Sequence, residues 1–514
     1  MCISKDTLSR SKMPTEYIDG HPDRCEEWFE GKTIFITGGS GFMGKVLIEK
    51  LLRACPKIKK IIMLIRDKKG KTPEQRLKEI FDGPLFDKLK AEYGADHVKK
   101  VVACKGDVAA EELAISKEDR AWLCEEVQIV FHCAATIRFD ETLKKAVLLN
   151  VRGTKLMLDL AREMKNLMVF VHLSTAYCHL NERVLYEKPY PPPASPHHVI
   201  KCCEWMSEEV LETITPKLLG NIPNTYAFTK ALGEALVCDE MDNLPVVILR
   251  PSIVLPIWLE PIPGWTDNIN GPTGLLIGAG KGVIRTMWCN GDGYADYVPV
   301  DIAVNCMIAS TYDYVHFKGV RRIYNVTSSA EYKISYEEII EIGRKIVETK
   351  IPLNGVAWYP GGSMKKSKLY HNICFFLYHL VPALFVDALL ILLGYKPVLM
   401  RVQRRISKGF EVFEYYANNQ WDFHNEDSME ARKLMNPTEK KKYRLDGDGI
   451  DYEEYFTNCI HAARLYILKE TDDQLPAARR HMKVMWCVDK FCKTMIICGF
   501  MYLIYKYLLL PIFT

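Results

Sequence analysis

The chain has 514 residues, of which 48% are hydrophobic and 26% are charged, a composition typical of a globular protein with more than one domain. Its formal net charge of +4 is too small to indicate nucleic-acid binding. The seventeen cysteines form no CxxC pair, and the polar first residues contain no secretory signal. We therefore expect reduced thiols in a cytosol-facing protein, and we assign no metal site.

A glycine-rich turn follows thirty polar residues, 1–30, which we expect to form a loose arm. Residues 33–36 are a short apolar run with β-branched side chains, and a helical pattern covers 45–53. The glycines between them let a strand turn tightly into a helix and let the backbone approach a pyrophosphate. The flanking strand and helix favour a dinucleotide site over a purely structural turn. The expected contact residues are Thr37, Gly38, Gly39, Ser40, Gly41, Phe42, Met43 and Gly44.

The end of the second expected strand, residues 60–65, indicates which dinucleotide binds. An acidic residue there would hold the ribose 2′-hydroxyl of NAD, but this sequence has Arg66, with Lys68 and Lys69 close behind. A cation suits the 2′-phosphate of NADP, although a solvated basic loop gives the same pattern. We expect NADPH as the cofactor.

Two further strand ends are expected to face this cofactor. Residues 101–104 form a strand shortly before Asp107, whose carboxylate is expected to meet the adenine. The apolar run 127–135 ends in Ala134 and Ala135, which are small enough for the cofactor to lie against the backbone. His132 lies inside this run and is interpreted as a core histidine. Alternating strands and helices predict an α/β fold with a doubly wound, Rossmann-type parallel sheet.

The catalytic candidates lie at another strand end and on a helix. The strand that begins at Val169 ends in Ser174 and Thr175, and ligands of open α/β sheets sit beyond the carboxyl ends of strands. Tyr226 and Lys230 are four residues apart at the start of a helical segment, so they share one face. We expect the Lys230 ammonium to lower the pKa of Tyr226 from its usual value of about 10 and to hold the nicotinamide ribose. Together with the glycine turn, these residues indicate a hydride-transfer enzyme.

Here the sequence resembles the extended short-chain dehydrogenase/reductases and, within them, the fatty acyl-CoA reductases. The resemblance covers nearly the whole chain. Gly38-Gly-Ser40 stands where Gly-Ala-Thr is more usual, a change that the turn tolerates. The stretches that carry the resemblance are residues 37–53, 131–139, 172–177, 224–232, 249–254, 263–268, 280–285 and 298–301.

The resemblance implies a long-chain fatty acyl-CoA substrate, reduced by NADPH to a primary alcohol through an aldehyde. It assigns the strand-end hydroxyl to Thr175, with Ser174 second, and completes the catalytic set with Tyr226 and Lys230. It also implies a peroxisomal or endoplasmic reticulum membrane. The sequence leaves the oligomeric state open.

Residues 261–287 are rich in Gly, Pro and Trp and are interpreted as an irregular loop on the substrate side. Within it, Lys281 and Arg285 either meet the phosphates of coenzyme A or are solvated surface cations, and the second interpretation is favoured.

The composition changes from about residue 352. Residues 373–393 are strongly apolar but are interrupted by His379, Pro382 and Asp387, so we interpret them as a buried helical hairpin or the wall of an acyl tunnel. The basic cluster that follows either contacts anionic headgroups or is a solvated helix face. It consists of Lys396, Arg401, Arg404, Arg405 and Lys408.

The tail, residues 494–513, has Lys506 as its only charge and is long enough to span a bilayer. Lys483, Lys490 and Lys493 precede it, which favours a cytosolic main body. We predict a single tail-anchoring membrane helix that contacts membrane lipid. The expected domains are an arm (1–30), an NADP-binding domain (31–351), a mainly helical C-terminal domain (352–475), and a linker with the anchor (476–514).

Two other functions remain open. A membrane-associated hydroxysteroid or sugar-nucleotide dehydrogenase or epimerase would have a similar nucleotide half, but the large C-terminal domain argues against it. An inactive scaffold that binds NADP would have no need for Thr175, Tyr226 and Lys230 together.

Overall fold

The computed structural model describes residues 21–509 except 69, 270 and 329–332. Its centre is a seven-stranded sheet of parallel neighbours in the order β11-β7-β5-β4-β1-β2-β3. The chain starts in the middle and proceeds outward in both directions, which confirms the predicted doubly wound fold. The strands are β1 (Thr33–Thr37), β2 (Lys60–Ile65), β3 (Val101–Lys105), β4 (Ile129–His132), β5 (Val169–Leu173), β7 (Val246–Pro251) and β11 (Ile323–Val326).

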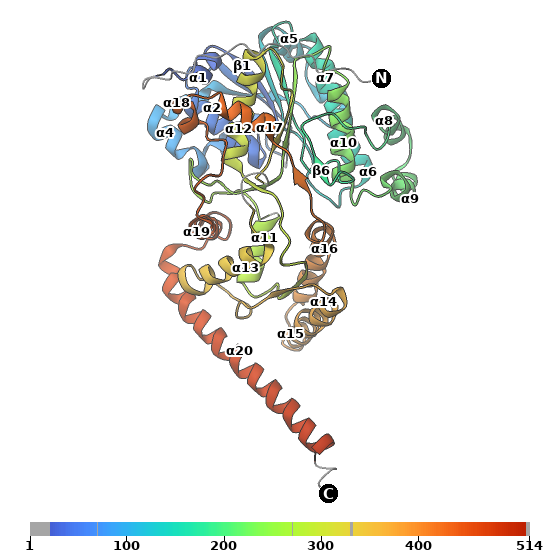
Figure 1. Ribbon diagram of the computed structural model, residues 1–514, viewed down its shortest axis with the longest axis vertical. Helices are drawn as coiled ribbons and strands as arrows, with labels where there is room; N and C mark the ends of the chain where they lie inside the picture. Colours follow the sequence, from blue (N-terminus) through green and yellow to red (C-terminus); the bar gives the residue numbers. More distant parts are fainter. Residues whose placement is uncertain (1–20, 69, 270, 329–332, 510–514) are drawn as a thin grey trace.

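Helices cover both faces of this sheet (Figure 1). Successive strand residues point to opposite faces, so Ile34 and Ile36 of β1 pack into one core and Phe35 packs into the other. The first core includes residues of α2 (Phe42–Ala54), α4 (Asp87–Tyr93) and α12 (Val300–His316). The second includes residues of α5 (Lys117–Glu126), α7 (Gly153–Glu163) and α10 (Thr225–Cys238).

The predicted loose arm is partly packed. Residues 24–29 form α1 (Arg24–Phe29), whose Cys25 and Phe29 are buried. The Arg24 guanidinium forms an ion pair of 2.7 Å with the buried Glu439 near the other end of the chain. The part of the arm before residue 21 lies outside the described residues.

The C-terminal half returns to the nucleotide domain. Helix α16 (Leu399–Ala417) leads into β13 (Asp422–Phe423), which pairs with β6 (Val184–Leu185), and Trp421 enters the second core. The expected irregular loop at 261–287 contains a helix, α11 (Pro272–Gly280). The remaining C-terminal helices of this part are α13 (Tyr336–Lys345), α17 (Glu426–Lys433), α18 (Pro437–Lys442) and α19 (Tyr452–Ala462).

One apolar helix lies at the end of the molecule that is distant from the sheet. Helix α14 (Lys368–Phe375) continues through a π-turn at Phe376–Leu380 into α15 (Val381–Leu392), and α15 packs against α16. Among the described residues, this α14–α15 helix, Lys368–Leu392, is long and apolar enough to cross a membrane by length and composition. Only 17% of its most apolar stretch is buried, so the prediction of a buried hairpin is wrong.

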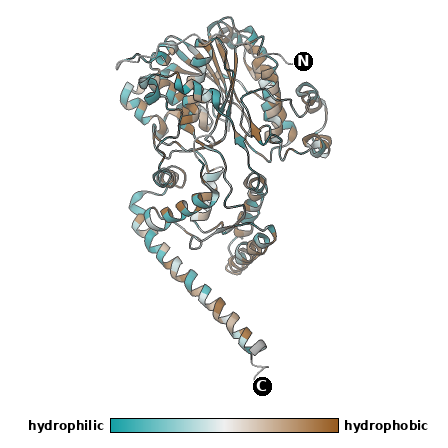
Figure 2. Ribbon diagram, viewed as in Figure 1, coloured by the Kyte–Doolittle hydropathy of each residue, from teal (hydrophilic) through white to brown (hydrophobic). Residues whose placement is uncertain are grey.

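Helix α20 (Leu475–Ile504) projects from the same end of the molecule (Figure 1). Hydrophobic residues follow one another along its outer part (Figure 2). The predicted membrane span, 494–513, therefore starts inside α20. Residues 510–513 of this span lie outside the described residues. The shorter elements are α3 (Pro73–Phe81), α6 (Leu143–Val147), α8 (Pro196–Trp205), α9 (Glu208–Leu219), β8 (Ile253–Leu255), β9 (Thr286–Trp288), β10 (Tyr297–Pro299) and β12 (Ser363–Lys365).

Candidate active site

The glycine turn joins β1 to α2 at the carboxyl edge of the sheet. Gly38 has φ +72°, and a Cβ there would lie 2.6 Å from the backbone carbonyl carbon of Cys133. A Cβ on Gly44 would lie 2.4 Å from the Gly38 oxygen, so only glycine allows α2 to start this close to β1. No side chain caps the amino end of α2, where Gly41 is the N-cap. The turn therefore keeps backbone N–H groups available to an anion, as a dinucleotide pyrophosphate requires.

Two guanidinium groups flank this turn. Arg76 of α3 donates to the Ser40 hydroxyl at 3.4 Å and to the backbone oxygen of Arg66 at 2.5 Å. Burial and the charge of Arg66 both lower the pKa of the Arg76 guanidinium. Arg66 in turn donates to the Asp107 carboxylate at 3.2 Å. The structure thus brings together the predicted Arg66 and Asp107 and adds Arg76, which lies beyond the loop that sequence reasoning considered.

The end of β4 is fixed to the end of β1 by a buried hydrogen bond. The Thr37 hydroxyl and the His132 Nδ1 are 2.8 Å apart, and the Ala134 N–H donates to the same hydroxyl at 3.3 Å. His132 is buried, and burial lowers its pKa to about 3, so it stays neutral as the interpretation of a core histidine requires. The side chain of Thr37 is therefore occupied inside the protein, while Ala134 and Ala135 are partly exposed at the strand end.

Helix α10 carries Tyr226 and Lys230 in its first two turns, behind the N-cap Asn224. The Lys230 ammonium is buried and donates to the backbone oxygen of Leu173, at the end of β5, at 2.6 Å. Burial lowers the pKa of Lys230 to about 8. The lysine thus links the helix to the strand that carries the catalytic candidates.

The predicted lowering of the Tyr226 pKa is wrong for this structure. Burial raises the pKa of the phenol to about 12, a hydrogen bond with Thr175 only partly offsets this, and Lys230 does not contribute. The reason is that the Lys230 ammonium is directed to the Leu173 oxygen. Tyr226 therefore keeps its proton at neutral pH, which suits a hydrogen-bond donor.

The two hydroxyls at the end of β5 have different surroundings. Thr175 Oγ1 donates to the Pro251 oxygen at 3.3 Å and lies beside Tyr226. Ser174 Oγ donates to the Glu234 carboxylate at 2.6 Å. The Ser174 hydroxyl is therefore turned into the protein, while the Thr175 hydroxyl lies beside the Tyr226 phenol.

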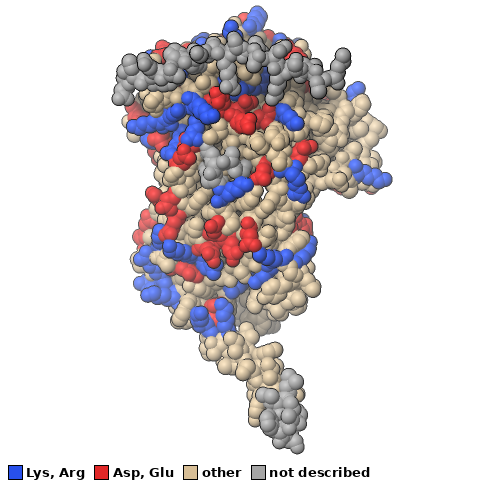
Figure 3. Space-filling view, viewed as in Figure 1, with Lys and Arg blue, Asp and Glu red and all other residues tan. Residues whose placement is uncertain are grey.

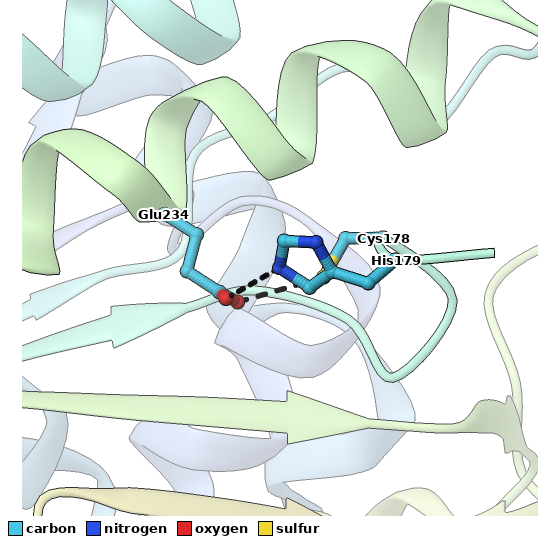
Figure 4. A group of neighbouring side chains, drawn as sticks. All are labelled: Cys178, His179 and Glu234. Carbon is cyan, nitrogen blue, oxygen red and sulfur yellow. Dashed lines mark hydrogen bonds and ion pairs between the residues drawn. The ribbon is translucent and has the colours of Figure 1, made fainter. Parts of the chain in front are cut away.

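Glu234 is the centre of a buried network one turn beyond Lys230 (Figure 4). Its carboxylate accepts hydrogen bonds from Arg250 at 2.7 Å and from His179 at 2.9 Å, besides the one from Ser174. Burial alone would raise the pKa of Glu234, but Arg250 and His179 hold it well below its usual range. Cys178, His179 and Glu234 also have the spacing of a metal site, yet the Arg250 guanidinium already neutralises this carboxylate. We interpret the network as an ion-pair support for the end of β5.

Sequence reasoning missed Glu234 and Arg250 as interacting residues. The available signal was that Glu234 lies in an apolar helical segment and Arg250 in an apolar strand. Both are buried, and because a buried charge requires a partner, each predicts an opposite charge nearby.

The C-terminal half also reaches this site. The Tyr416 hydroxyl, at the end of α16, accepts from Asn224 Nδ2 at 3.0 Å. The Phe139 ring lies 5.2 Å from that of Tyr226 and 5.6 Å from that of Tyr416, measured between centroids. Phe139 therefore links the Tyr226 ring to the C-terminal half of the chain.

The favoured interpretation of Lys281 and Arg285 as solvated surface cations is wrong. Lys281 Nζ donates to Glu470 at 2.9 Å, and Arg285 Nη2 lies 3.8 Å from the Asp489 carboxylate. Both cations are only partly exposed and link neighbouring segments. They are therefore engaged within the protein.

Comparisons with known proteins agree with this geometry. Two family models described as male sterility protein match residues 36–307 and 378–470. The chain is 41% identical over 461 residues to the fatty acyl-CoA reductase 1 of Rattus norvegicus, covering 89% of this chain and 88% of the relative. It is 37% identical over 450 residues to the fatty acyl-CoA reductase wat of Drosophila melanogaster, covering 87% and 86%.

Among solved structures, the reductase domain of a nonribosomal peptide synthetase from Mycobacterium tuberculosis is similar in fold. The TM-score is 0.57 at 18% identity, covering 87% of this chain and 96% of that chain.

Proposed function

The chain belongs to the fatty acyl-CoA reductase family, and from this premise we propose that it reduces long-chain fatty acyl-CoA to a primary alcohol with NADPH. The observation that carries the proposal is the meeting of Thr175, Tyr226 and Lys230 at the edge of the sheet where β1 ends in the glycine turn. One acyl-CoA, two NADPH and two protons give one alcohol, one coenzyme A and two NADP⁺.

We propose that residues 37–44, Arg66, Asp107, Ala134 and Ala135 hold the dinucleotide, with Lys230 at the nicotinamide ribose. The observation that favours NADPH over NADH is the Arg76 guanidinium, which donates to the Ser40 hydroxyl, together with the Arg66 cation, which is close enough to lower the pKa of Arg76. Two neighbouring cations beside the glycine turn suit the 2′-phosphate of NADP. When bound, the cofactor supplies the hydride for each reduction.

In the first reduction, Thr175 and Tyr226 donate hydrogen bonds to the thioester oxygen as it gains negative charge. The hemithioacetal oxyanion that forms then re-forms its carbonyl bond, expels coenzyme A as the thiolate and leaves an aldehyde at the enzyme. In the second reduction, Tyr226 gives its proton to the aldehyde oxygen. A phenol with a raised pKa is present in the neutral form that both steps need.

The remaining charged groups support these two donors. The Lys230 ammonium binds the nicotinamide ribose, and its hydrogen bond to the Leu173 oxygen holds α10 against the end of β5. Ser174 acts as a positioning residue because its hydrogen bond to Glu234 fixes the strand end from which Thr175 projects.

Replacing Tyr226 by phenylalanine tests the proposal. The Tyr226→Phe variant lacks the proton donor and should lose NADPH-dependent alcohol formation by at least about 10²-fold in kcat. Because the ring remains, cofactor binding measured by quenching of protein fluorescence should stay close to that of the wild type. Lipid analysis of the products should detect no alcohol, and full activity in this variant would disprove the assignment.

We further propose that the protein is anchored by the helical tail in a peroxisomal or endoplasmic reticulum membrane, with the catalytic part in the cytosol. The support is the exposed apolar surface of α20 and the lysines before it, Lys483, Lys490 and Lys493. Figure 3 shows Lys and Arg side chains at the lower end of the body and a projecting tail without charge along its visible described part.

A further inference from the structure

The α14–α15 helix has an exposed apolar face that is unusual for a protein surface. Phe385 is 64% exposed and Leu392 is 81% exposed, and other large apolar side chains along the helix are exposed as well. Contiguous apolar surface of this size marks a contact with a partner or a membrane. The exposed members are Leu369, Tyr370, Ile373, Phe376, Leu377, Tyr378, Val381, Leu384, Phe385, Val386, Leu389, Ile391 and Leu392.

The opposite face of the same helix is bound to the protein through polar groups. The His371 Nδ1 lies 3.1 Å from the Thr286 hydroxyl, and the His379 Nε2 accepts from the Arg285 N–H at 3.0 Å. Asp387 accepts from three backbone N–H groups at the start of α16, at 2.8 to 2.9 Å. All three polar residues are buried.

These contacts decide how the helix can meet a bilayer. His371, His379 and Asp387 are spaced eight residues apart, so they hold about 24 Å of the helix along one side of the body. A transmembrane orientation would pull these groups away from their partners into hydrocarbon, at a high cost. The helix can instead lie flat, with its apolar face in the membrane and its polar face on the protein.

The next helix adds positive charge to this face. Lys396 and four cations of α16 are exposed, and none of the five forms an ion pair with a described residue. Exposed cations beside an apolar face match anionic headgroups next to acyl chains. The five residues are Lys396, Arg401, Arg404, Arg405 and Lys408.

The α14–α15 helix is also linked to the proposed tail anchor. Arg285 binds His379 through its backbone and lies 3.8 Å from Asp489 of α20 through its side chain. Trp358 donates to the same carboxylate at 2.6 Å. Both apolar elements lie at the end of the molecule away from the sheet (Figure 1).

We propose that the exposed face of the α14–α15 helix, with the cations of α16, is a second membrane-binding surface that lies in the plane of one leaflet and contacts acyl chains and anionic headgroups. It goes beyond the proposed reaction, because it concerns how the body sits on the bilayer and does not depend on catalysis. The tail holds the protein on the membrane, and this surface fixes its orientation.

The test uses the full chain in vesicles of phosphatidylcholine and phosphatidylserine that contain a phospholipid with a photoactivatable acyl chain. After illumination, mass spectrometry identifies the labelled peptides. We expect label in residues 368–393 as well as in the tail. The control is Trp205 of α8, an apolar side chain that is 73% exposed but lies outside the apolar face of the α14–α15 helix, and we expect no label around it. Label confined to the tail would overturn the proposal.

Two sets of variants separate the apolar and the basic contributions. Phe385→Glu, Leu389→Glu and Leu392→Glu together should remove label from 368–393 and leave label in the tail, while the matched set Trp205→Glu, Val210→Glu and Val320→Glu should change neither. Arg401→Glu, Arg404→Glu and Arg405→Glu should reduce the label in 368–393 at least several-fold on anionic vesicles and little on neutral ones. Unchanged labelling in both sets would contradict the proposal.

A second copy of the chain is the other occupant that the test must detect. Three results together would show that the surface is a protein interface and would overturn the proposal. Mass photometry would find a dimer of the nanodisc-bound protein, and residues 368–393 would stay unlabelled. The variant with Phe385→Glu, Leu389→Glu and Leu392→Glu would be a monomer. The Tyr226→Phe variant should be labelled like the wild type, so failure of the proposed reaction and failure of this proposal are distinguishable.

Discussion

At the scale of single residues, Arg66 and Arg76 are the groups through which we propose that the site selects NADPH. Arg76 donates to Ser40 in the glycine turn, and the charge of Arg66 lies close enough to lower the pKa of the Arg76 guanidinium. A charge-assisted hydrogen bond contributes roughly 1.5–3 kcal/mol. Loss of both guanidinium groups should therefore strongly weaken the binding of a dinucleotide that carries a 2′-phosphate.

We predict that Arg66→Ala with Arg76→Ala raises the KM for NADPH by at least about tenfold and leaves the KM for NADH nearly unchanged. Steady-state rates with each cofactor measure this difference. Lys68→Ala is the matched control, because it removes one exposed cation from the same loop. A similar rise for both cofactors would show that the two arginines do not select the 2′-phosphate.

Lys230 gives the reaction a defined dependence on pH. Burial lowers its pKa to about 8, and burial raises that of Tyr226 to about 12, so the lysine loses its proton first. We predict that kcat/KM is level near neutrality and falls as the pH rises above about 8, since the neutral amine makes a weaker hydrogen bond to the nicotinamide ribose than the ammonium does. Initial rates at saturating NADPH across pH 6–10 measure this profile.

Titration of Lys230 does not destabilise the fold above about pH 8, so unfolding linked to this lysine does not explain the fall in kcat/KM. The unfolded lysine keeps its proton to about pH 10.4, so between the two pKa values the unfolded state binds more protons and stability rises with pH. Thermal melts at each pH provide the control. In Lys230→Arg, the remaining activity should show no decline near pH 8, and a decline there would assign the titration to another group.

At the scale of elements, the glycines of the turn have different structural roles. Gly38 supplies the positive φ, and Gly44 allows α2 to approach β1. Gly41 has an ordinary φ of −80°, and a Cβ there would meet only the Gly38 oxygen, at 3.2 Å. Gly41 is therefore free of the packing constraint that holds Gly44.

We predict that Gly44→Ala destabilises the protein by about 1–3 kcal/mol or more and reduces NADPH binding, because α2 must move away from β1. Gly41→Ala should keep the wild-type stability within about 1 kcal/mol while it still weakens NADPH binding. Urea unfolding and cofactor titration of both variants measure the two effects. Equal stability losses would refute this division between packing and binding.

The elements also explain how far the sequence could predict this protein. The strands of the nucleotide half follow from short apolar runs that end at small or polar residues, as in β1 and β2, and the glycine turn marks their functional edge. The partnership of Glu234 with Arg250 joins an α10 residue to a β7 residue, and no local pattern encodes such a contact.

The α14–α15 helix differs from its predicted burial for a physical reason. His379 and Asp387 predict that the apolar residues around them are buried, as in a soluble protein. In the structure the polar residues face the body and the apolar residues face outward, which reverses the usual amphipathic arrangement. Only the placement of α16 and of the segment around Arg285 reveals which face the protein covers.

At the scale of the whole molecule, α16 connects the membrane-facing end to the site. It begins at Leu399, which donates to Asp387, and ends at Ala417, next to Tyr416, so its nineteen residues cover about 28 Å. An enzyme held at a fixed height above a bilayer can thus receive an acyl substrate at a constant distance from the lipid. Two separate attachments achieve this better than a single flexible tail.

The tail and the α14–α15 helix should therefore differ in how they hold the membrane. A chain that ends at Lys493 keeps the bonds of Asp489 to Trp358 and to Lys493 but lacks the proposed span. We predict that alkaline carbonate releases this shortened chain from membranes and leaves the full chain in the pellet, because only a spanning helix resists extraction.

The same shortened chain should still float with phosphatidylserine vesicles at low ionic strength through the α14–α15 helix and α16. Raising the salt should weaken this binding, since counterions screen the cations of α16 from the headgroups. A shortened chain that stays in the pellet after carbonate treatment would show that another segment anchors the protein. Wild-type resistance combined with salt-sensitive flotation of the shortened chain would assign anchoring to the tail and orientation to the α14–α15 helix.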